Sequence, residues 1–185
     1  SGARQAMAAT RSCCHDGIFC TLCCFTHGVP ALDKRPFADC RHCVERMGCA
    51  AHMLPPDACA AFRCAYLTGM SDDDTWPHEC RFVQEYRWTR YGHTWIMSAL
   101  DAARLDTSLA RREIIQALER GLVVVLEKPG RTVITFADDR PALAIAPRGE
   151  AQDICVTPAS EYFGFSVSAK PPVHADLGVH AWHQM

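Results

Sequence analysis

The sequence predicts an α+β fold, in which a loop-rich cysteine module packs on a small ββαββ unit. Eight cysteines fall within residues 20–64, a segment that has few long apolar repeats. Residues 81–139 instead contain two alternating segments, a helical apolar repeat and two runs of β-branched residues. Burial of apolar side chains can therefore stabilise the second segment, whereas the first segment needs another source of stability.

Composition divides the chain into four segments. No acidic residue precedes Asp16, and the first segment is rich in Ala, Ser and Thr, as in a flexible leader or the remnant of an organellar transit peptide. Prolines mark the turns of the cysteine module, where we expect one or two helical turns after Pro56. Candidate edge strands cover 153–157 and 162–168. The segments are a leader (1–16), the cysteine module (17–80), the α+β unit (81–139) and a C-terminal extension ending in an extended tail (140–185).

Hydrophobic periodicity gives the order of elements in the α+β unit. Ile114 and Leu118 belong to an apolar repeat at helical spacing. Thr107 or Ser108 can cap the start of this helix, and Gly121 can end it. The expected elements are a strand over 81–88, a strand over 93–100, a helix over 109–120, and a hairpin made of 122–126 and 132–136.

Aromatic residues alternate with charged residues in the first of these strands. Phe82, Tyr86 and Trp88 share one face, which predicts that they are buried against the helix. The alternative is that the basic and aromatic run over 81–91 stacks on and clamps single-stranded RNA. Strand alternation favours core packing over this alternative.

Two CxxC pairs give the most specific signal in the chain. Cys20 and Cys23 form the first pair, Cys40 and Cys43 form the second, and sixteen residues (24–39) separate them. A two-residue spacer lets a tight turn aim two sulfurs at one ion, and a second pair completes a tetrahedron. The spacing therefore predicts a four-thiolate metal site.

The remaining cysteines indicate a second centre. Cys24 adjoins Cys23, and neighbouring residues rarely reach the same small ion without strain. The simplest hypothesis combines Cys24 with Cys49, Cys59 and Cys64, although spacing leaves the partition between the two centres open. The candidate metal ligands are Cys20, Cys23, Cys24, Cys40, Cys43, Cys49, Cys59 and Cys64.

Zinc, in two ions, is the expected metal, and an iron–sulfur cluster is the alternative because both accept four thiolates. The even total of twelve cysteines also allows a disulfide framework. A chain of 185 residues with 49% hydrophobic residues can bury its own core, however, and does not need disulfide bonds for stability. We therefore expect a reducing intracellular compartment, either the cytoplasm or the mitochondrial matrix.

The C-terminal extension contains further residues of types that can bind metal. Cys155 is expected to be a small buried hydrophobic residue, and His180 and His183 are expected to be solvated.

Residues 20–67 resemble the zinc- or iron-chelating cysteine-cluster family (YkgJ-like, CxxCxxCC). All eight cysteines match its order CxxCC, CxxC, C, C, C, and the triplet Leu32-Asp33-Lys34 and the C-A-A-F-R-C ending over 59–64 also match. The resemblance implies eight metal-binding cysteines and continues more loosely to about residue 139. Family members commonly carry Arg-Pro before the seventh cysteine and arginine after it, where this chain has Pro55-Pro56 and Ala60.

These departures remove guanidinium groups that can bind an anionic ligand or offset thiolate charge. Arg41, Arg63 and His52 are the replacements that the sequence offers. No acid–base pair, nucleophile or substrate loop can be assigned, so no small-molecule substrate is identified and an enzyme is disfavoured. The net charge of −2 and the absence of an apolar run of eighteen residues favour neither nucleic acid nor a membrane span.

The sequence therefore predicts a non-catalytic metal-binding protein that acts as a docking or assembly component. It would bind protein partners, with RNA as a further partner in a larger organellar or ribonucleoprotein complex. The alternative is an iron–sulfur accessory enzyme of redox or methyl-transfer chemistry, because the cysteine cluster is similar to that of flagellin lysine methylases.

Overall fold

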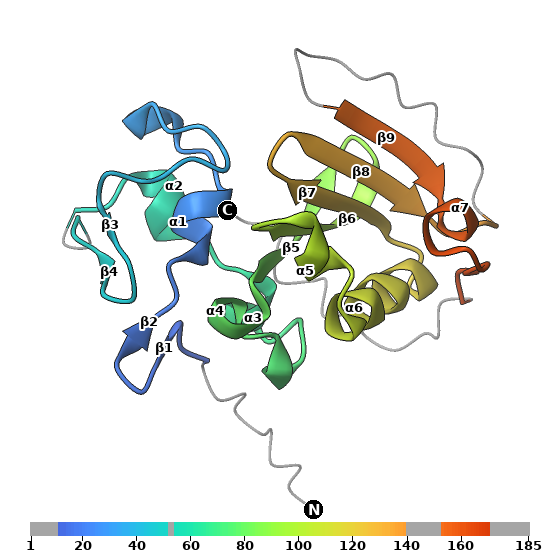
Figure 1. Cartoon of the computed structure of the whole chain (residues 1–185), viewed down its shortest axis with the longest axis horizontal. Helices are drawn as coiled ribbons and strands as arrows, with labels where there is room; N and C mark the ends of the chain where they lie inside the picture. Colours follow the sequence, from blue (N-terminus) through green and yellow to red (C-terminus); the bar gives the residue numbers. More distant parts are fainter. Residues whose placement is uncertain (1–10, 52–53, 140–152, 171–185) are drawn as a thin grey trace, which may run out of the picture.

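The computed structural model describes residues 11–51, 54–139 and 153–170. The chain has an α+β fold, as the sequence predicts, with a region of short elements beside a five-stranded sheet (Figure 1). No helix in the described part of the chain is long and apolar enough to cross a membrane. The leader up to residue 10 and the tail from residue 171 lie outside the described residues.

Residues 11–80 contain only short elements. Prolines and left-handed residues end them early: Asp33 and Arg46 have φ of 50° and 62°. The helical turns expected after Pro56 form two separate short helices. The elements are β1 (Cys14–His15), β2 (Ile18–Phe19), α1 (Leu22–Thr26), η1 (Pro30–Leu32), β3 (Cys43–Val44), β4 (Gly48–Cys49), α2 (Asp57–Ala61), α3 (Ala65–Thr68), η2 (Asp73–Thr75) and α4 (Pro77–Cys80).

The sheet has the strand order β5-β6-β7-β8-β9. The pairs β5–β6 and β7–β8 are antiparallel, whereas β6–β7 and β8–β9 are parallel. Two helices connect the parallel pair β6–β7, as a parallel connection requires. The elements are β5 (Phe82–Thr89), β6 (Gly92–Ala99), α5 (Ala102–Leu105), α6 (Ser108–Glu119), β7 (Val123–Lys128), β8 (Arg131–Phe136), β9 (Asp153–Pro158) and α7 (Ala159–Phe163).

Local signals set both ends of α6. The Thr107 side chain accepts a hydrogen bond from Ala110 N at 3.2 Å, which confirms the predicted cap. Gly121 has φ of 75°, and its N donates to Leu118 O at 2.8 Å. One face of the helix packs on the sheet, where Gln84 Nε2 donates to the buried Glu113 carboxylate at 3.0 Å.

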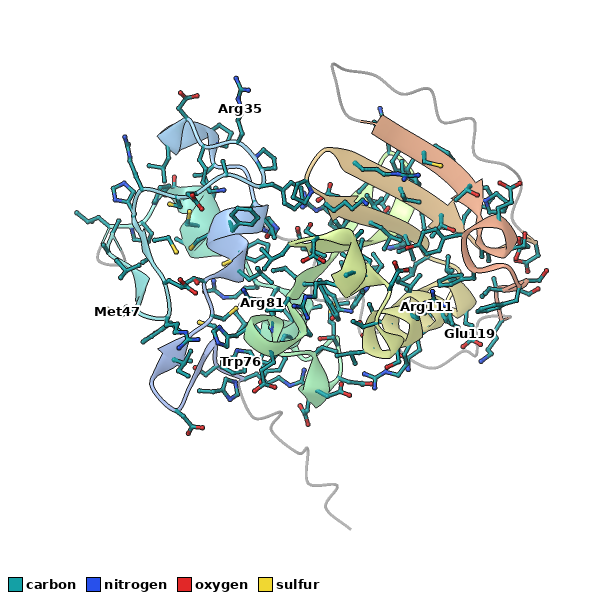
Figure 2. The ribbon with its side chains drawn as sticks, viewed as in Figure 1. Arg35, Met47, Trp76, Arg81, Arg111 and Glu119 are labelled. Atoms are coloured by element: carbon teal, nitrogen blue, oxygen red, sulfur yellow. The ribbon has the colours of Figure 1, made fainter. Side chains whose placement is uncertain are left out.

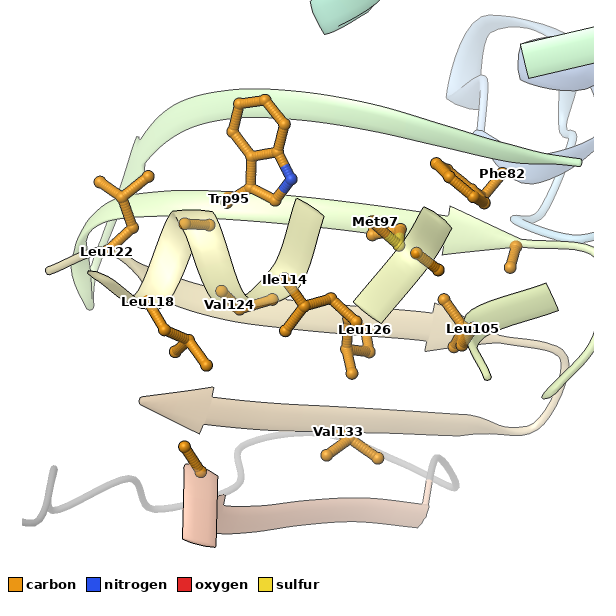
Figure 3. Packing of buried hydrophobic residues seen from close by; sticks show 14 of the residues in the cluster. Phe82, Trp95, Met97, Leu105, Ile114, Leu118, Leu122, Val124, Leu126 and Val133 are labelled. Carbon is orange, nitrogen blue, oxygen red and sulfur yellow. The ribbon is translucent and has the colours of Figure 1, made fainter. Parts of the chain in front are cut away.

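The largest cluster of buried side chains lies between α6 and the sheet. Figure 3 shows Phe82 at one end of this cluster and Leu122 at the other. Cys155 packs against it, partly buried. Its buried members are Ala65, Phe82, Trp95, Met97, Ala99, Leu105, Ala110, Ile114, Ala117, Leu118, Leu122, Val124, Leu126, Val133, Ala159 and Val167.

Two expectations for this half of the chain are wrong. Trp88 shares a face with the buried Phe82, but its side chain is 71% exposed, because the packed cluster ends before the strand does. The segment 162–168 forms no strand: α7 ends at Phe163, and Gly164 follows with φ of 78°. The strand predicted over 153–157 is confirmed as β9.

The two halves of the chain share a second apolar cluster. α1, α3 and α4 all contact β5, the first strand of the sheet. Its buried members are Leu22, Cys64, Tyr66, Trp76 and Val83. Both faces of β5 are therefore used, one toward α6 and the other toward the cysteine-rich region.

Candidate metal centre

The first cysteines are positioned by a hairpin and a short helix. Cys20 follows β2 directly, and Cys23 and Cys24 lie within α1. α1 buries Leu22 and Thr26 and contacts β5. Packing against the sheet therefore fixes where the thiols of this helix lie.

A turn and a small hairpin position the next three cysteines. Cys43 N donates to Cys40 O at 2.9 Å, which closes the turn of the second CxxC pair. Cys43 then lies opposite Cys49 across the β3–β4 pair. Opposite residues in an antiparallel pair have Cβ atoms about 5 Å apart. The hairpin thus brings Cys49 to the second CxxC pair.

The last two candidate ligands flank a break between helices. Cys59 is exposed on α2, and its N donates to Pro56 O at 2.8 Å. Cys64 precedes α3 and is buried beside Trp76 in the shared cluster. The break at Phe62, which has an extended backbone, separates the surroundings of these two thiols.

Six of the eight candidate ligands lie near one another, and three of them line one hollow. Cys24, Cys40 and Cys43 line it together. Hydrogen bonding with Cys23, burial and the charge of Cys23 raise the pKa of Cys24. Burial, followed by the charges of neighbouring thiols, raises the pKa of Cys59. We call this set the main thiol group: Cys23, Cys24, Cys40, Cys43, Cys49 and Cys59.

A second, smaller set lies against the shared apolar cluster. Cys20 N donates to Cys13 O at 2.7 Å, and Cys20 packs against the cluster that contains Cys64. Burial raises the pKa of Cys20 to about 11, and the charges of Cys64, Cys13 and Cys24 add to this effect. The structure therefore places Cys24 with the second CxxC pair and Cys20 beside Cys64, which differs from the grouping that spacing favours.

Lys34 lies beside the main thiol group, and the sequence argument used it only as part of a motif. Its Nζ donates to Phe25 O at 3.1 Å, to Arg35 O at 3.2 Å and also to His27 O. Burial lowers the pKa of Lys34, against the opposing effect of nearby thiols, among them Cys40. The residue is 8% exposed. A buried ammonium thus ties the loops around the main thiol group and would offset part of the charge of thiolates formed on metal binding.

Arg81 brings a further positive group to the hollow, and His78 lies there with it. Both line it with the cysteines, although they follow the last candidate ligand by many residues. Arg81 has φ of 65°, and its Nη1 donates to His78 O at 3.5 Å. Arg63 instead donates to the carbonyl oxygens of Ala60 and Phe62 at 2.9 and 2.8 Å. Spacing along the chain offered no signal for Arg81, because only folding brings it to the cysteines.

The histidines of the cysteine-rich region have other contacts. His27 Nε2 lies 2.5 Å from Glu85 Oε1, and its Nδ1 lies 2.9 Å from Thr26 Oγ1. His42 Nε2 accepts a hydrogen bond from Arg41 Nε at 3.3 Å on the surface. His52, like His180 and His183 of the tail, lies outside the described residues.

The donor set fits a thiophilic cation in its chemistry. None of the twelve cysteines forms a disulfide. Burial raises the pKa of Cys43 to about 11, and the thiol of Cys24 adds to this effect, so the thiolate form needs a compensating cation. Within the ranges that the structure describes, no three His, Cys, Asp or Glu side chains are already arranged to hold a metal ion. Binding would therefore require rotation of thiols that are neighbours but point at no common centre.

Comparison of the chain with protein-family models, with curated proteins and with solved structures finds no match. The assignment of a function therefore depends on the residues of the candidate site itself.

Proposed function

We propose that residues 17–80 form a metal-binding module and that the protein acts as a docking or assembly component. The module would hold zinc through the eight cysteines that match the cysteine-cluster family, with an iron–sulfur cluster as the alternative metal group. The metal would be structural, because regular elements in this segment are too short to hold it together by packing alone. Free thiols are consistent with a reducing compartment, the cytoplasm or the mitochondrial matrix.

The observation that carries the metal proposal is that thiols from separate elements lie close together. Cys24 of α1 lines one hollow with Cys40 and Cys43 of the second CxxC turn, and strand pairing brings Cys49 next to Cys43. Burying so many thiols close together opposes their ionisation unless a cation is present. The buried ammonium of Lys34 supplies one such charge, which supports a cluster that carries net negative charge when it is metallated.

An exposed apolar patch on the same region supports docking to a protein. The patch consists of Phe19, Val44 and Met47, whose exposed fractions are 42%, 43% and 76%. Phe19 N donates to Arg46 O at 2.9 Å, and Met47 N donates to Val44 O at 3.0 Å, so β2 adjoins the turn that follows β3 and brings the three residues together. Figure 2 shows Met47 at the outer edge of the molecule. Exposed apolar patches of this kind mark interaction sites.

A redox or methyl-transfer accessory enzyme remains the second candidate. The hollow that contains Cys24, Cys40 and Cys43 is also lined by Arg81 and His78. The guanidinium of Arg81 restores a positive group of the kind lost at Pro55 and Ala60. It favours binding of an anionic group beside the thiols, although Asp39 and Glu45 also line the hollow. An iron–sulfur spectrum would favour this candidate over zinc.

Metal analysis of protein purified without oxygen tests the metal proposal. The wild-type chain should contain about two equivalents of zinc, each held by four thiolates. Cys43→Ser should reduce the metal content, whereas Cys155→Ser, which changes a partly buried thiol in the other half of the chain, should not. Visible charge-transfer absorption would instead assign an iron–sulfur cluster. Less than half an equivalent of any transition metal would overturn the proposal.

Native extraction tests the docking proposal. The wild-type chain should migrate within a large assembly, and Phe19→Ser combined with Met47→Ser should release it. Phe165→Ser is the matched control, because Phe165 is 48% exposed on the opposite half of the chain. A free chain of 20.5 kDa that turns over a small molecule would favour the enzyme candidate instead.

A further inference from the structure

The turn between β5 and β6 presents an exposed group of aromatic and basic side chains. β5 ends at Thr89, β6 begins at Gly92, and Trp88 lies opposite His93 in the pair. Trp88 is 71% exposed and His93 is also exposed. We call residues 86–93 the hairpin tip.

The hairpin tip is exposed because the core under it ends one residue pair earlier. Trp95, opposite Tyr86, is 3% exposed and belongs to the cluster beneath α6. Trp88 and His93 continue the same face of the strands but are not members of that cluster. Burial of an indole is favourable by about 2 kcal/mol or more. Because Trp88 lies in a group of rings with Tyr86 and His93 and is not a single exposed side chain, its exposure indicates an interaction site.

Contacts within the tip hold the rings in place. The rings of Tyr86 and His93 stack, with centroids 5.6 Å apart and planes 12° apart. Tyr86 Oη also hydrogen bonds to His93 Nδ1. The Trp88 ring meets the His93 ring edge to face, with centroids 4.6 Å apart. A base could therefore stack on Trp88 without first ordering a flexible side chain.

The charge of the tip is positive. Residues 86–94 contain two arginines and no aspartate or glutamate. Arg90 lies over the Tyr91 ring, with its Cζ 4.8 Å from the centroid, and it has no carboxylate partner among the described residues. Arg87 pairs with Glu85 at 2.6 Å, and the Glu85 carboxylate is only 12% exposed. A partner with negative charge and planar apolar rings fits this surface.

We infer that the hairpin tip binds single-stranded nucleic acid, with a base stacked on Trp88 and a phosphate bound by Arg90. This goes beyond the proposed metal and docking functions, because no residue of the hairpin tip is a candidate ligand or a member of the apolar patch. Unpaired bases expose the ring faces that an indole can stack on, whereas duplex bases do not. Stacking on Trp88 gives little sequence preference, because every base has such a face.

Fluorescence anisotropy with short labelled oligouridylate and oligothymidylate tests this inference. The metal-loaded full chain should bind both, and a duplex of the same length more weakly. Trp88→Ala should lower the affinity about 10-fold, as expected for loss of one stacked base. Arg90→Ala should weaken binding. It should also reduce, by about one, the magnitude of the slope of the logarithm of the binding constant against the logarithm of the salt concentration, because one phosphate contact is lost.

Two control variants remove an exposed aromatic ring and an exposed arginine outside the hairpin tip. Phe165→Ala removes a 48% exposed ring, and Arg111→Ala removes a 49% exposed arginine that already pairs with Asp106 at 3.6 Å. Figure 2 shows Arg111 on α6. Neither should change the affinity more than about two-fold, the size of an ordinary surface substitution.

Equal losses from Trp88→Ala and Phe165→Ala would overturn the inference, as would wild-type binding that prefers duplex. Self-association of the wild-type chain that is abolished by Trp88→Ala, with no binding of either oligonucleotide, would also overturn it and would assign the tip to protein contacts. Metal content measured on the same samples separates these outcomes from failure of the metal proposal.

Discussion

Residues 11–80 and residues 81–139 are stabilised in different ways, although they are parts of one chain. In the first region, the longest described helices have five residues, whereas the second has strands of eight residues and a helix of twelve. Six of the buried hydrophobic residues of the described chain belong to the first region and twenty to the second. The first region contains eleven of the twelve cysteines.

This difference indicates where each region obtains its free energy of folding. Ordering a residue costs about 1–2 kcal/mol of backbone entropy, which burial of apolar surface must offset. The sheet unit has the buried surface to do so. The cysteine-rich region does not, so we expect its fold to depend on the proposed metal and on its contacts with β5. Four experiments test this difference in the source of stability.

Removal of metal should have the largest effect. A structural zinc site supplies on the order of 10 kcal/mol, so a chelator should unfold residues 17–80 while β6, β7 and β8 stay folded. Hydrogen exchange measured by mass spectrometry should show loss of protection in the first region only, with β5 intermediate because Val83 lies in the shared cluster. Unchanged protection of residues 17–80 after complete metal removal would contradict a structural role for the metal.

A core substitution in the sheet unit should have the next largest effect. Ile114 is fully buried beneath α6, and Ile114→Ala should lower the free energy of unfolding by about 2–5 kcal/mol. Urea denaturation followed by circular dichroism measures this change. The control Arg111→Ala, on the same helix but 49% exposed, should change it by less than about 0.5 kcal/mol. Under native conditions the metal content of both variants should equal that of the wild type.

The contact between the two regions at Glu85 should give a moderate, pH-dependent effect. Burial alone would raise the pKa of Glu85, but hydrogen bonding with His27 and the charges of His27 and Arg87 outweigh it and hold the pKa below its ordinary value. Glu85→Gln should therefore cost about 1–3 kcal/mol at neutral pH.

The sign of the pH dependence follows from the lowered pKa of Glu85. The folded state binds the proton less tightly than the unfolded chain, so the stabilisation is complete above pH 4.5, the ordinary pKa, and is lost as pH falls through the folded-state pKa. Wild type and Glu85→Gln should converge in stability at low pH, as measured by urea denaturation. Glu79→Gln, at an exposed site, is the control and should show no such convergence. A constant difference at all pH values would exclude this linkage.

The surface pair between η2 and α6 should have the smallest effect. Arg112 donates to both carboxylate oxygens of Asp74, at 2.7 and 2.9 Å, and the hydrogen bond with Arg112 lowers the pKa of Asp74. Because the Asp74 side chain is 57% exposed, Asp74→Asn should cost no more than about 1 kcal/mol. The cost should shrink further in high salt, and a salt-independent loss would point to a contact other than this ion pair.

Local pattern in the sequence determined much of the sheet unit. The caps of α6, the hairpin β7–β8 and the strand β9 follow from residues within one element or its turn. The eight candidate ligands are likewise visible as spacings, because a CxxC turn is a local structure. Metal identity and binding stay predictions, since thiols that gather at a hollow do not show which ion they hold.

Tertiary structure alone decided the surroundings of these residues. Alternation predicted a buried Trp88, but the extent of α6 left that end of the strand uncovered and its indole 71% exposed. The grouping of Cys24 with Cys43, and of Cys20 with Cys64, depends on where α1 packs against β5. Arg81 reaches the thiols only because the sheet and the cysteine-rich region share a cluster. Periodicity specifies which face of an element is apolar, whereas the length and position of the neighbouring element determine which residues on that face are covered.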